Sequence, residues 1–479
     1  MRLLRYPLLL VSLFVLGSAP ASEEWISLFD GKTLAGWKAS ENPGSPRVED
    51  GMIVCEGKRA HLFYVGPDGN AEFENFEFEA EVKTEPGANS GVYFQTKWQD
   101  KGWPEAGFEA QVNNKQPTFK EYDYRENKKT ASLYGIRNLY KPLARDGEWF
   151  TLNVKVTRPR VQIRLNGKLV SDYVEPANPM LPSPGPKLNL LGKGTFALQC
   201  HDEDSRARYR NLRVRRLPPG EDESITKPVL SEQDLRRLAL GKDNFPIINL
   251  RVRLHDNLTF GKIEELRSLT GIFAGMAGNL GDFPDAASTR EIFAASENAP
   301  TFIGLDLGPD GGLNETIGHL PRETVLKFDY IFGEPFRAAF TNSGDREQAD
   351  MDAAVDRIVH RIETAPIDVY VNVMVMNDGS HSRAEALWTE ERMQRVIAAA
   401  AKHGVAFEIN LRERTPSEKF IKLAKAAKVK FTFGSDVNTA ENYGDWSYAL
   451  EMQKACGLTW KDMWVPGHAP TRAQRELKK

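Results

Sequence analysis

The spacing of apolar residues changes near residue 217, and this change limits the folds open to the chain more than any other feature. Before it, apolar and polar residues alternate in short runs separated by Gly, Pro and Asn, as in residues 76–82. This pattern is typical of antiparallel strands that bury one face. After it, apolar runs alternate with amphipathic stretches such as 350–363 and 391–403, which indicates parallel strands joined by crossover helices. The sequence therefore predicts an all-β sandwich followed by an α/β domain.

The α/β part contains seven predicted strands, at residues 246–254, 272–278, 301–307, 328–332, 367–375, 406–411 and 430–434. Seven strand–helix units predict a closed or nearly closed TIM-like (βα)7 barrel, whose site would lie at the C-terminal ends of the strands. The Pro- and Gly-rich segment 217–223 separates this barrel from the sandwich.

The predicted organisation is a signal peptide at 1–21, a sandwich at 22–217, a linker at 218–244, a barrel at 245–465 and a C-terminal tail at 466–479. The first segment carries Arg2 and Arg5, an apolar run at 8–16 and a small-residue end at Ala21, which is typical of a cleaved secretory signal. Its apolar run is too short to span a bilayer. We therefore expect a periplasmic or secreted protein without a membrane span. Its two domains are expected to fold independently, because each has its own core pattern.

Charge and cysteine content limit the partners of the chain. The net charge of −3 is spread over interspersed acidic and basic residues, which provides no electrostatic footprint for nucleic acid. The expected partner is a small neutral molecule. Cysteines are limited to Cys55, Cys200 and Cys456, so neither a disulfide framework nor a thiolate metal cluster is predicted. A Cys55–Cys200 bridge stays open in an oxidising compartment.

Three predicted strands of the sandwich carry polar residues at every second position, which places these residues on one face. They are Glu109 and Gln111, Gln199 and His201, and Tyr93, Gln95 and Lys97. If the strands are neighbours, the face combines the groups needed to bind a sugar and move a proton on it. An ordinary solvated face explains the same alternation. Trp37, Trp98 and Trp103 could either stack on sugar rings or fill the core.

A set of ordered motifs covers the sandwich: LFDGKTL at 28–34 with GW at 36–37, SGVYF at 90–94, GFEAQ at 107–111, SLYG at 132–135, GEW at 147–149 and LQCH at 198–201. Over about residues 24–217 this set resembles the 3-keto-disaccharide hydrolase family, also described as 3-keto-glucoside 1,2-lyase or 3-keto-2-hydroxy-glucal hydratase. The resemblance implies a concanavalin-like jelly roll that acts on glucosides oxidised at carbon 3. Residues on the motif positions are Glu109, Gln111, Tyr134, Gln199 and His201. Gln95 stands where arginine is common in the family and Asn114 where aspartate is common, which is consistent with altered substrate choice or lost activity.

The polar residues of the sandwich suit an elimination on an oxidised sugar. A ketone at carbon 3 acidifies the hydrogen on carbon 2, so a positioned base can remove it and the enolate then expels the glycosidic oxygen from carbon 1. Glu109 is the candidate base, His201 the acid for the leaving group, and Tyr134 or Lys97 the donor to the enolate oxygen. The candidate substrate-binding residues are Gln95, Lys97, Gln111, Gln199, Trp37 and Trp103. An ordinary glycosidase needs two flanking carboxylates, whereas this face offers one candidate.

The second half resembles a polymerase-and-histidinol-phosphatase-like (PHP-like) domain over about residues 245–465, in its first strand and in the stretches 406–410 and 430–436. The first strand of that family ends in an Asp-x-His-x-His ligand set, but Asn249, Arg251 and Arg253 stand at these positions. A guanidinium cannot ligate a cation, so no metal is expected in the barrel. A divalent metal ion in the sandwich stays open.

Three carboxylates, Asp306, Glu408 and Asp436, remain at or near predicted strand ends of the barrel. An ion-pair network with the two arginines is the favoured interpretation, because strand-end charges often pair. Binding of an anion such as a phosphate or a uronate by the arginine pair is the alternative.

Two classes of function follow. The first is an exported enzyme that cleaves 3-keto-glucosides. The second is a non-catalytic extracytoplasmic carbohydrate-binding protein, with a lectin-like sandwich and a pseudoenzyme barrel. The enzyme hypothesis requires Glu109 and His201 to point toward one site.

Overall fold

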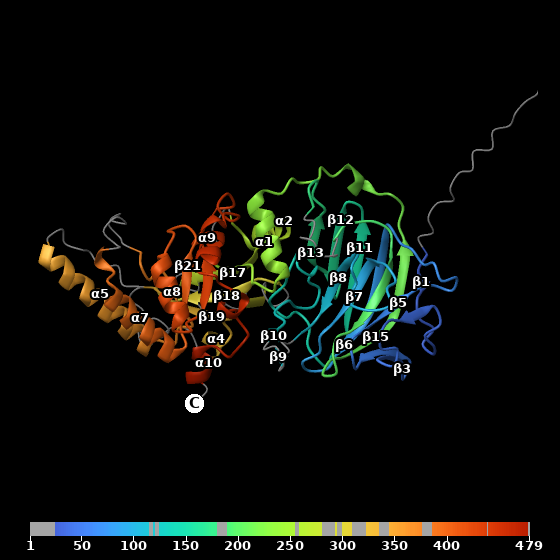
Figure 1. Cartoon of the computed structure of the whole chain (residues 1–479), viewed down its shortest axis with the longest axis horizontal. Coiled ribbons are helices and arrows are strands. Elements are labelled where there is room, and N and C mark those ends of the chain that lie inside the picture. Colours follow the sequence, from blue (N-terminus) through green and yellow to red (C-terminus); the bar gives the residue numbers. More distant parts are fainter. Residues whose placement is uncertain are drawn as a thin grey trace, which may run out of the picture.

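The computed structural model describes residues 24–114, 118–119, 124–179, 189–253, 258–279, 293–294, 299–308, 322–334, 344–375, 386–437 and 439–477. It contains a sheet-rich N-terminal part and a barrel-containing C-terminal part, which lie side by side (Figure 1). The signal peptide predicted at residues 1–21 lies outside the described residues. Among the helices of the described segments, none is long and apolar enough to cross a membrane.

The N-terminal part is a sandwich of two antiparallel sheets, as predicted. The first sheet has the order β13 (Lys168–Val174), β12 (Arg160–Leu165), β11 (Phe150–Thr157), β6 (Phe76–Thr84), β15 (Arg206–Arg216), β4 (Met52–Glu56) and β3 (Pro46–Glu49), with β1 (Ile26–Ser27) paired to β15. The second sheet has the order β2 (Trp37–Ala39), β5 (Ala60–Tyr64), β14 (Thr195–Cys200), β7 (Ser90–Thr96) and β8 (Phe108–Val112). A separate pair consists of β9 (Thr118–Phe119) and β10 (Tyr124–Arg125).

Strand β6 shows why the sandwich forms. Its apolar residues are buried and its glutamates alternate with them on the outer face, as the period of two requires. Phe78 stacks on Phe196 of the opposite sheet, with ring centroids 4.7 Å apart. On the outer face, Glu77 pairs with Arg215 of β15 at 2.5 Å.

The C-terminal part contains a closed barrel of seven parallel strands. They are β16 (Ile248–Val252), β17 (Phe273–Asn279), β18 (Phe302–Asp306), β19 (Tyr330–Gly333), β20 (Val369–Tyr370), β21 (Ala406–Asn410) and β22 (Phe431–Gly434). Each of the seven predicted strands is present. A TIM barrel has eight strands, so the likeness is limited to the closed, parallel arrangement.

Helices flank the barrel strands and join the two parts of the chain (Figure 1). They are η1 (Glu221–Ser224), α1 (Glu232–Lys242), α2 (Phe260–Thr270), α4 (Arg322–Val325), α5 (Gly344–Thr364), α7 (Glu390–His403), α8 (Glu418–Ala426), α9 (Ser447–Ala455), η3 (Trp460–Asp462) and α10 (Arg472–Leu477). The segment predicted as a linker, 218–244, contains η1 and α1. Helix α1 begins at a capping box formed by Ser231 and Asp234, a local signal that satisfies the first free backbone N–H groups.

The sandwich and the barrel share an extensive interface. The segment 126–141 of the sandwich lies at the N-terminal ends of the barrel strands: Tyr140 accepts the backbone N–H of Ile247 at 3.0 Å, and its ring contacts Phe273 with centroids 5.4 Å apart. Lys141 donates to the carbonyl of Thr301 at 3.2 Å. The apolar core of the sandwich therefore continues into the base of the barrel.

Candidate functional site

The outer face of the second sheet carries a buried polar cluster around Glu109. Strand register sets Tyr93 of β7 beside Glu109 of β8. Gln199 of β14 donates from its Nε2 to Glu109 Oε1 at 3.1 Å and to Tyr93 Oη at 3.2 Å. Gly91 lies beneath the carboxylate, and a Cβ at this position would overlap Glu109 Oε1. The missing side chain thus allows Glu109 to lie down on the sheet, where Gln199 holds it.

An aromatic and imidazole wall borders this cluster. His61 of β5 is paired in register with Gln199, and its ring contacts Tyr93 and Trp103 with centroids 5.4 and 5.5 Å apart. Trp103 also lies against the His201 ring, at 5.2 Å. The wall therefore connects the Glu109 cluster to His201 along one face of the sheet.

His201 is oriented by a carboxylate. Its Nδ1 lies 2.6 Å from Asp202 Oδ2. Burial raises the pKa of Asp202, but hydrogen bonding and charge attraction from His201 outweigh this and hold the pKa below its usual value. Because the ionised carboxylate accepts the Nδ1 proton, this contact fixes the orientation of the imidazole ring.

Tyr134 lies beside Glu109, whose carbonyl accepts the Tyr134 backbone N–H at 2.9 Å. Its Oη donates to Glu126 at 3.0 Å and accepts from the Lys128 ammonium at 3.2 Å. Lys128 is fully buried and lies 3.4 Å from Glu126. Burial lowers the pKa of Lys128, while the nearby carboxylates of Glu126, Glu109 and Asp243 favour its charged form. The third predicted catalytic residue thus belongs to a charged network next to the candidate base.

The other predicted binding residues occupy different places. Trp37 lies in the core, where its Nε1 donates to the carbonyl of Leu28 at 2.7 Å; its prediction as a sugar platform was wrong, because the ring fills the space between the sheets. The Gln95 amide donates to the Glu74 carbonyl at 2.8 Å. Gln111 is buried, and its Oε1 accepts the backbone N–H of Val112 at 3.2 Å.

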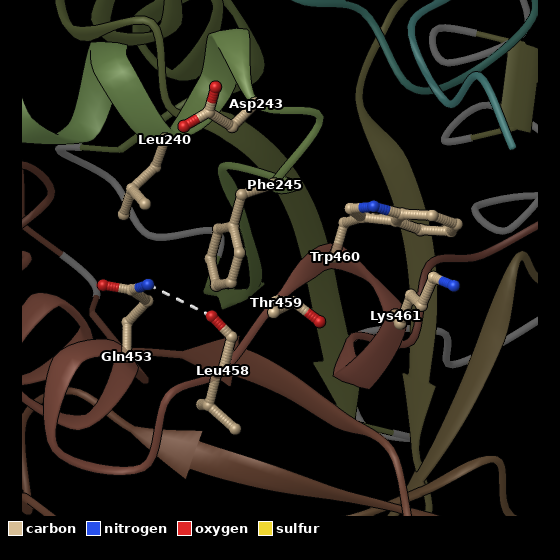
Figure 2. Close-up of a pocket in the computed structure, with 8 residues that line it drawn as sticks. All are labelled: Leu240, Asp243, Phe245, Gln453, Leu458, Thr459, Trp460 and Lys461. Atoms are coloured by element: carbon tan, nitrogen blue, oxygen red, sulfur yellow. Dashed lines mark hydrogen bonds between the residues drawn. The ribbon is translucent and has the colours of Figure 1, made fainter. Parts of the chain in front are cut away.

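Lys97 lies in a separate groove at one end of the second sheet, apart from Glu109. The lining residues include Tyr64, Asn70, Glu72, Lys97, Trp98 and Thr195. A further pocket opens between α1 and η3 in the C-terminal part, where Leu240, Phe245 and Trp460 form an apolar lining beside Asp243 and Lys461 (Figure 2).

Sequence reasoning missed His61, Glu126, Lys128 and Asp202. The alternation of β5, with Ala60, Leu62 and Tyr64 in the core, carried a signal for His61. Lys128 lies in a segment without strand or helix, so no periodicity marked it. Within the described parts of the chain, no group of three or more His, Cys, Asp or Glu residues is placed to hold a metal ion.

The C-terminal ends of the barrel strands hold a second polar cluster. Arg251 is buried and contacts Glu334. Its guanidinium nitrogens also lie 3.4 Å from a carboxylate oxygen of Glu408 and 3.6 Å from one of Asp436. Arg253 contacts Asp436 at 2.6 Å and Asp306 at 2.9 Å. The favoured ion-pair network is therefore present, with Glu334 as a member that the sequence did not indicate. Because four carboxylates surround two guanidinium groups, the cluster is a poor receptor for an anion.

Burial changes the protonation of this barrel cluster. It raises the pKa of Glu408 to about 6, with Asp436 and Asp306 adding to the effect and Arg251 opposing it. It also raises the pKa of Glu334, together with the neighbouring Asp306. Glu408 Oε1 is buried and has no hydrogen-bond partner among the described residues.

Comparisons with known proteins concern the sandwich. Residues 24–215 match the 3-keto-alpha-glucoside-1,2-lyase-like domain family. A 3-keto-disaccharide hydrolase of Bacteroides thetaiotaomicron is 28% identical over 172 residues, which are 32% of this chain and 59% of that protein. The chain thus spans about three fifths of that relative's length.

Solved structures with related sandwiches include two from Parabacteroides distasonis, both assigned provisionally as glycosyl hydrolases. One is 23% identical, covers 40% of this chain and 94% of its own, and has a TM-score of 0.33. The other is 25% identical, covers 40% of this chain and 100% of its own, and has a TM-score of 0.32. Residues 24–215 are therefore similar to the 3-keto-alpha-glucoside-1,2-lyase-like domains and to a 3-keto-disaccharide hydrolase.

Proposed function

We propose that the chain is an enzyme that cleaves 3-keto-glucosides, with the outer face of the second sheet as its active site. The observation that supports this most is the Glu109 cluster. Its carboxylate accepts from Gln199, which also donates to Tyr93, and it lies on the same face as His201, beside Tyr134. A surface carboxylate without a functional role would face water and would not need a hydrogen bond from a buried amide.

In the proposed reaction, Glu109 removes the proton from carbon 2 of the oxidised sugar. Tyr134 donates a hydrogen bond to the enolate oxygen that forms at carbon 3. The enolate then re-forms the ketone, the bond between carbon 1 and the glycosidic oxygen breaks, and the His201 imidazolium donates its Nε2 proton to the leaving oxygen. Addition of water across the new carbon 1–carbon 2 double bond yields the free 3-keto sugar. Trp103, next to His201, offers an aromatic face on which a sugar ring can stack.

The test is conversion of 3-keto-trehalose and 3-keto-cellobiose by the full chain, followed as release of glucose. Glu109→Gln keeps the shape of the side chain and an acceptor for Gln199 but removes the base, so turnover should fall by about 100-fold or more while the unfolding temperature stays close to that of the wild type. Glu105→Gln, an exposed glutamate before the same strand, is the matched control. Full turnover by Glu109→Gln would move the base elsewhere. Absence of glucose release by the wild type on both substrates would favour the carbohydrate-binding alternative.

For the barrel, we propose a PHP-like domain in which ion pairs have replaced the metal centre. The contacts of Arg251 with Glu334 and Glu408 support this, since each guanidinium occupies the carboxylates that a dication would need and repels it. Elemental analysis of the purified chain and of Glu408→Gln tests the proposal: about one tightly held zinc, manganese or iron ion per chain that is lost in the Glu408 variant would contradict it.

A further inference from the structure

We propose that Asn244, which precedes the first barrel strand, is a positioning residue for the sandwich site: its Oδ1 holds the buried ammonium of Lys128 next to Tyr134. This inference rests on the proposed function and deepens it. Asn244 lies outside the residues that match the sandwich family, so the family comparison assigns it no role. The barrel part would thereby complete an active site that lies in the sandwich.

The contacts of Asn244 are directed at one short segment of the sandwich. Its side-chain Oδ1 accepts from Lys128 Nζ at 3.0 Å, and its backbone carbonyl accepts from Asn127 Nδ2 at 2.9 Å. Asn244 itself is buried, and its φ of 65° lies in the left-handed region, which asparagine and glycine tolerate best. Helix α1 ends at Lys242 with Asp243 as its C-cap, immediately before Asn244, so the helix end sets where this acceptor lies.

Lys128 depends on this acceptor. An ammonium has three protons, and the three side-chain acceptors of Lys128 are Glu126, Tyr134 and Asn244. The charged and titratable groups that face it are the carboxylates of Glu126, Glu109 and Asp243 and the phenol of Tyr134. In a fully buried position, loss of one acceptor shifts the balance toward the neutral amine.

The protonation state of Lys128 affects how strongly the Tyr134 hydroxyl donates a hydrogen bond. An ammonium that donates to Tyr134 Oη, and lies 4.3 Å from the ring centroid, polarises the phenol and makes its own O–H a stronger donor. In the structure that donor serves Glu126, and in the proposed reaction it serves the enolate oxygen. Asn244 would therefore act on the reaction through Lys128 and Tyr134 without touching the sugar.

Two substitutions in the full chain test the inference, because they change the acceptor in opposite ways. Asn244→Gly accepts the same φ and keeps the backbone carbonyl but deletes Oδ1, whereas Asn244→Asp replaces the amide by a carboxylate. The pKa of Lys128 is followed by NMR of protein labelled with ¹³C at lysine Cε, with Lys128→Met assigning the resonance. We expect the pKa of Lys128 to fall by about one unit in Asn244→Gly and to rise by about one unit in Asn244→Asp. The pH at which turnover of 3-keto-trehalose declines on the alkaline side should shift in the same two directions.

Lys141→Met is the control, since it removes a contact of the same interface with Thr301 and Asp329 but lies outside the Lys128 network. It should leave both the pKa of Lys128 and the pH profile unchanged. An unchanged pKa of Lys128 in both Asn244 variants would overturn the inference, as would equal shifts in the Lys141 variant. The NMR measurement does not depend on turnover, so a wild type that releases no glucose would refute the proposed function while the contact of Asn244 with Lys128 is still decided.

Discussion

At the mouth of the barrel, the two guanidinium groups of Arg251 and Arg253 lie among four carboxylates. This excess of carboxylates decides how the cluster responds to pH. Burial raises the pKa of Glu408 from 4.5 to about 6, because its charge is poorly compensated: Arg251 Nη1 is 3.4 Å away. A carboxyl whose pKa is higher in the folded chain than in the unfolded chain takes up its proton more readily when folded. Its contribution to stability is thus complete below pH 4.5 and is lost as the pH rises through 6.

We therefore expect Glu408→Gln to become relatively more stable than the wild type as the pH rises. The difference in the free energy of unfolding between the two proteins should change by about 2 kcal/mol between acid and neutral pH, which corresponds to the shift in pKa. Urea unfolding of both proteins over this pH range, followed by a probe in the barrel, measures the change. A difference that does not vary with pH would show that Glu408 stays ionised in the folded chain.

At the scale of single elements, the alternation within each strand places the residues of both clusters. In β14, Phe196, Leu198 and Cys200 face the core while Gln199 faces outward. The same rule brings Glu408 of β21 into the barrel interior, where its Oε1 lies against Gly434 of β22. In both clusters, a glycine on the neighbouring strand leaves room for a glutamate side chain: Gly434 for Glu408, and Gly91 for Glu109.

Gly304 of β18 provides a test of this close packing. The Tyr330 ring lies directly on its α-carbon, and Tyr330 Oη donates to the carbonyl of Leu250 at 2.6 Å. A methyl group at residue 304 would push the ring away from this acceptor, so Gly304→Ala should destabilise the barrel by about 2 kcal/mol or more.

Gly261→Ala, in helix α2, is the control, since an added Cβ would meet only Thr259 Oγ1 at 4.0 Å. It should stabilise the chain slightly, because alanine favours the helix. Thermal unfolding of the two variants measures both effects. Equal unfolding temperatures would mean that the barrel interior adapts to the methyl group without cost.

At the scale of the whole molecule, the interface couples the two parts. Arg137 of the sandwich donates to the carbonyls of Ser268 and Leu269 at 2.6 and 3.0 Å, and burial lowers its pKa to about 10. Arg267 of α2 donates to the carbonyl of Val170 at 2.7 Å. These hydrogen bonds form only when both parts are present, so the interface opposes the expectation of independent folding that the sequence supports.

A fragment that ends near Pro219 should consequently be less stable than the sandwich within the full chain. Truncation exposes Ile136 and Tyr140 to water. It also removes the Ser268 and Leu269 carbonyls that accept from Arg137, and the Asn244 acceptor of Lys128. We expect a lower unfolding temperature by several degrees, since a loss of 1 kcal/mol shifts the midpoint of a domain of this size by about 2–4 °C, together with binding of a dye that recognises exposed apolar surface. An unfolding temperature equal to that of the full chain would restore the view of two independent domains.

The sequence by itself determined what depends on neighbours along the chain. Strand periodicity is local, so it predicted both sheet types, all seven barrel strands and the shared face of Glu109, Gln199 and His201. Residue chemistry likewise predicted the pairing of Arg251 and Arg253 with strand-end carboxylates.

Only the tertiary structure decided what depends on segments far apart in the chain. Trp37 was as compatible with a sugar platform as with the core, and the packing of the two sheets buried it. Lys128 lies in an irregular segment, and its partner Asn244 follows more than 100 residues later, so no local pattern could join them. The physical reason is that side-chain alternation records which face is apolar, whereas the partner of a buried charge is chosen by whichever distant segment the fold brings within hydrogen-bond distance.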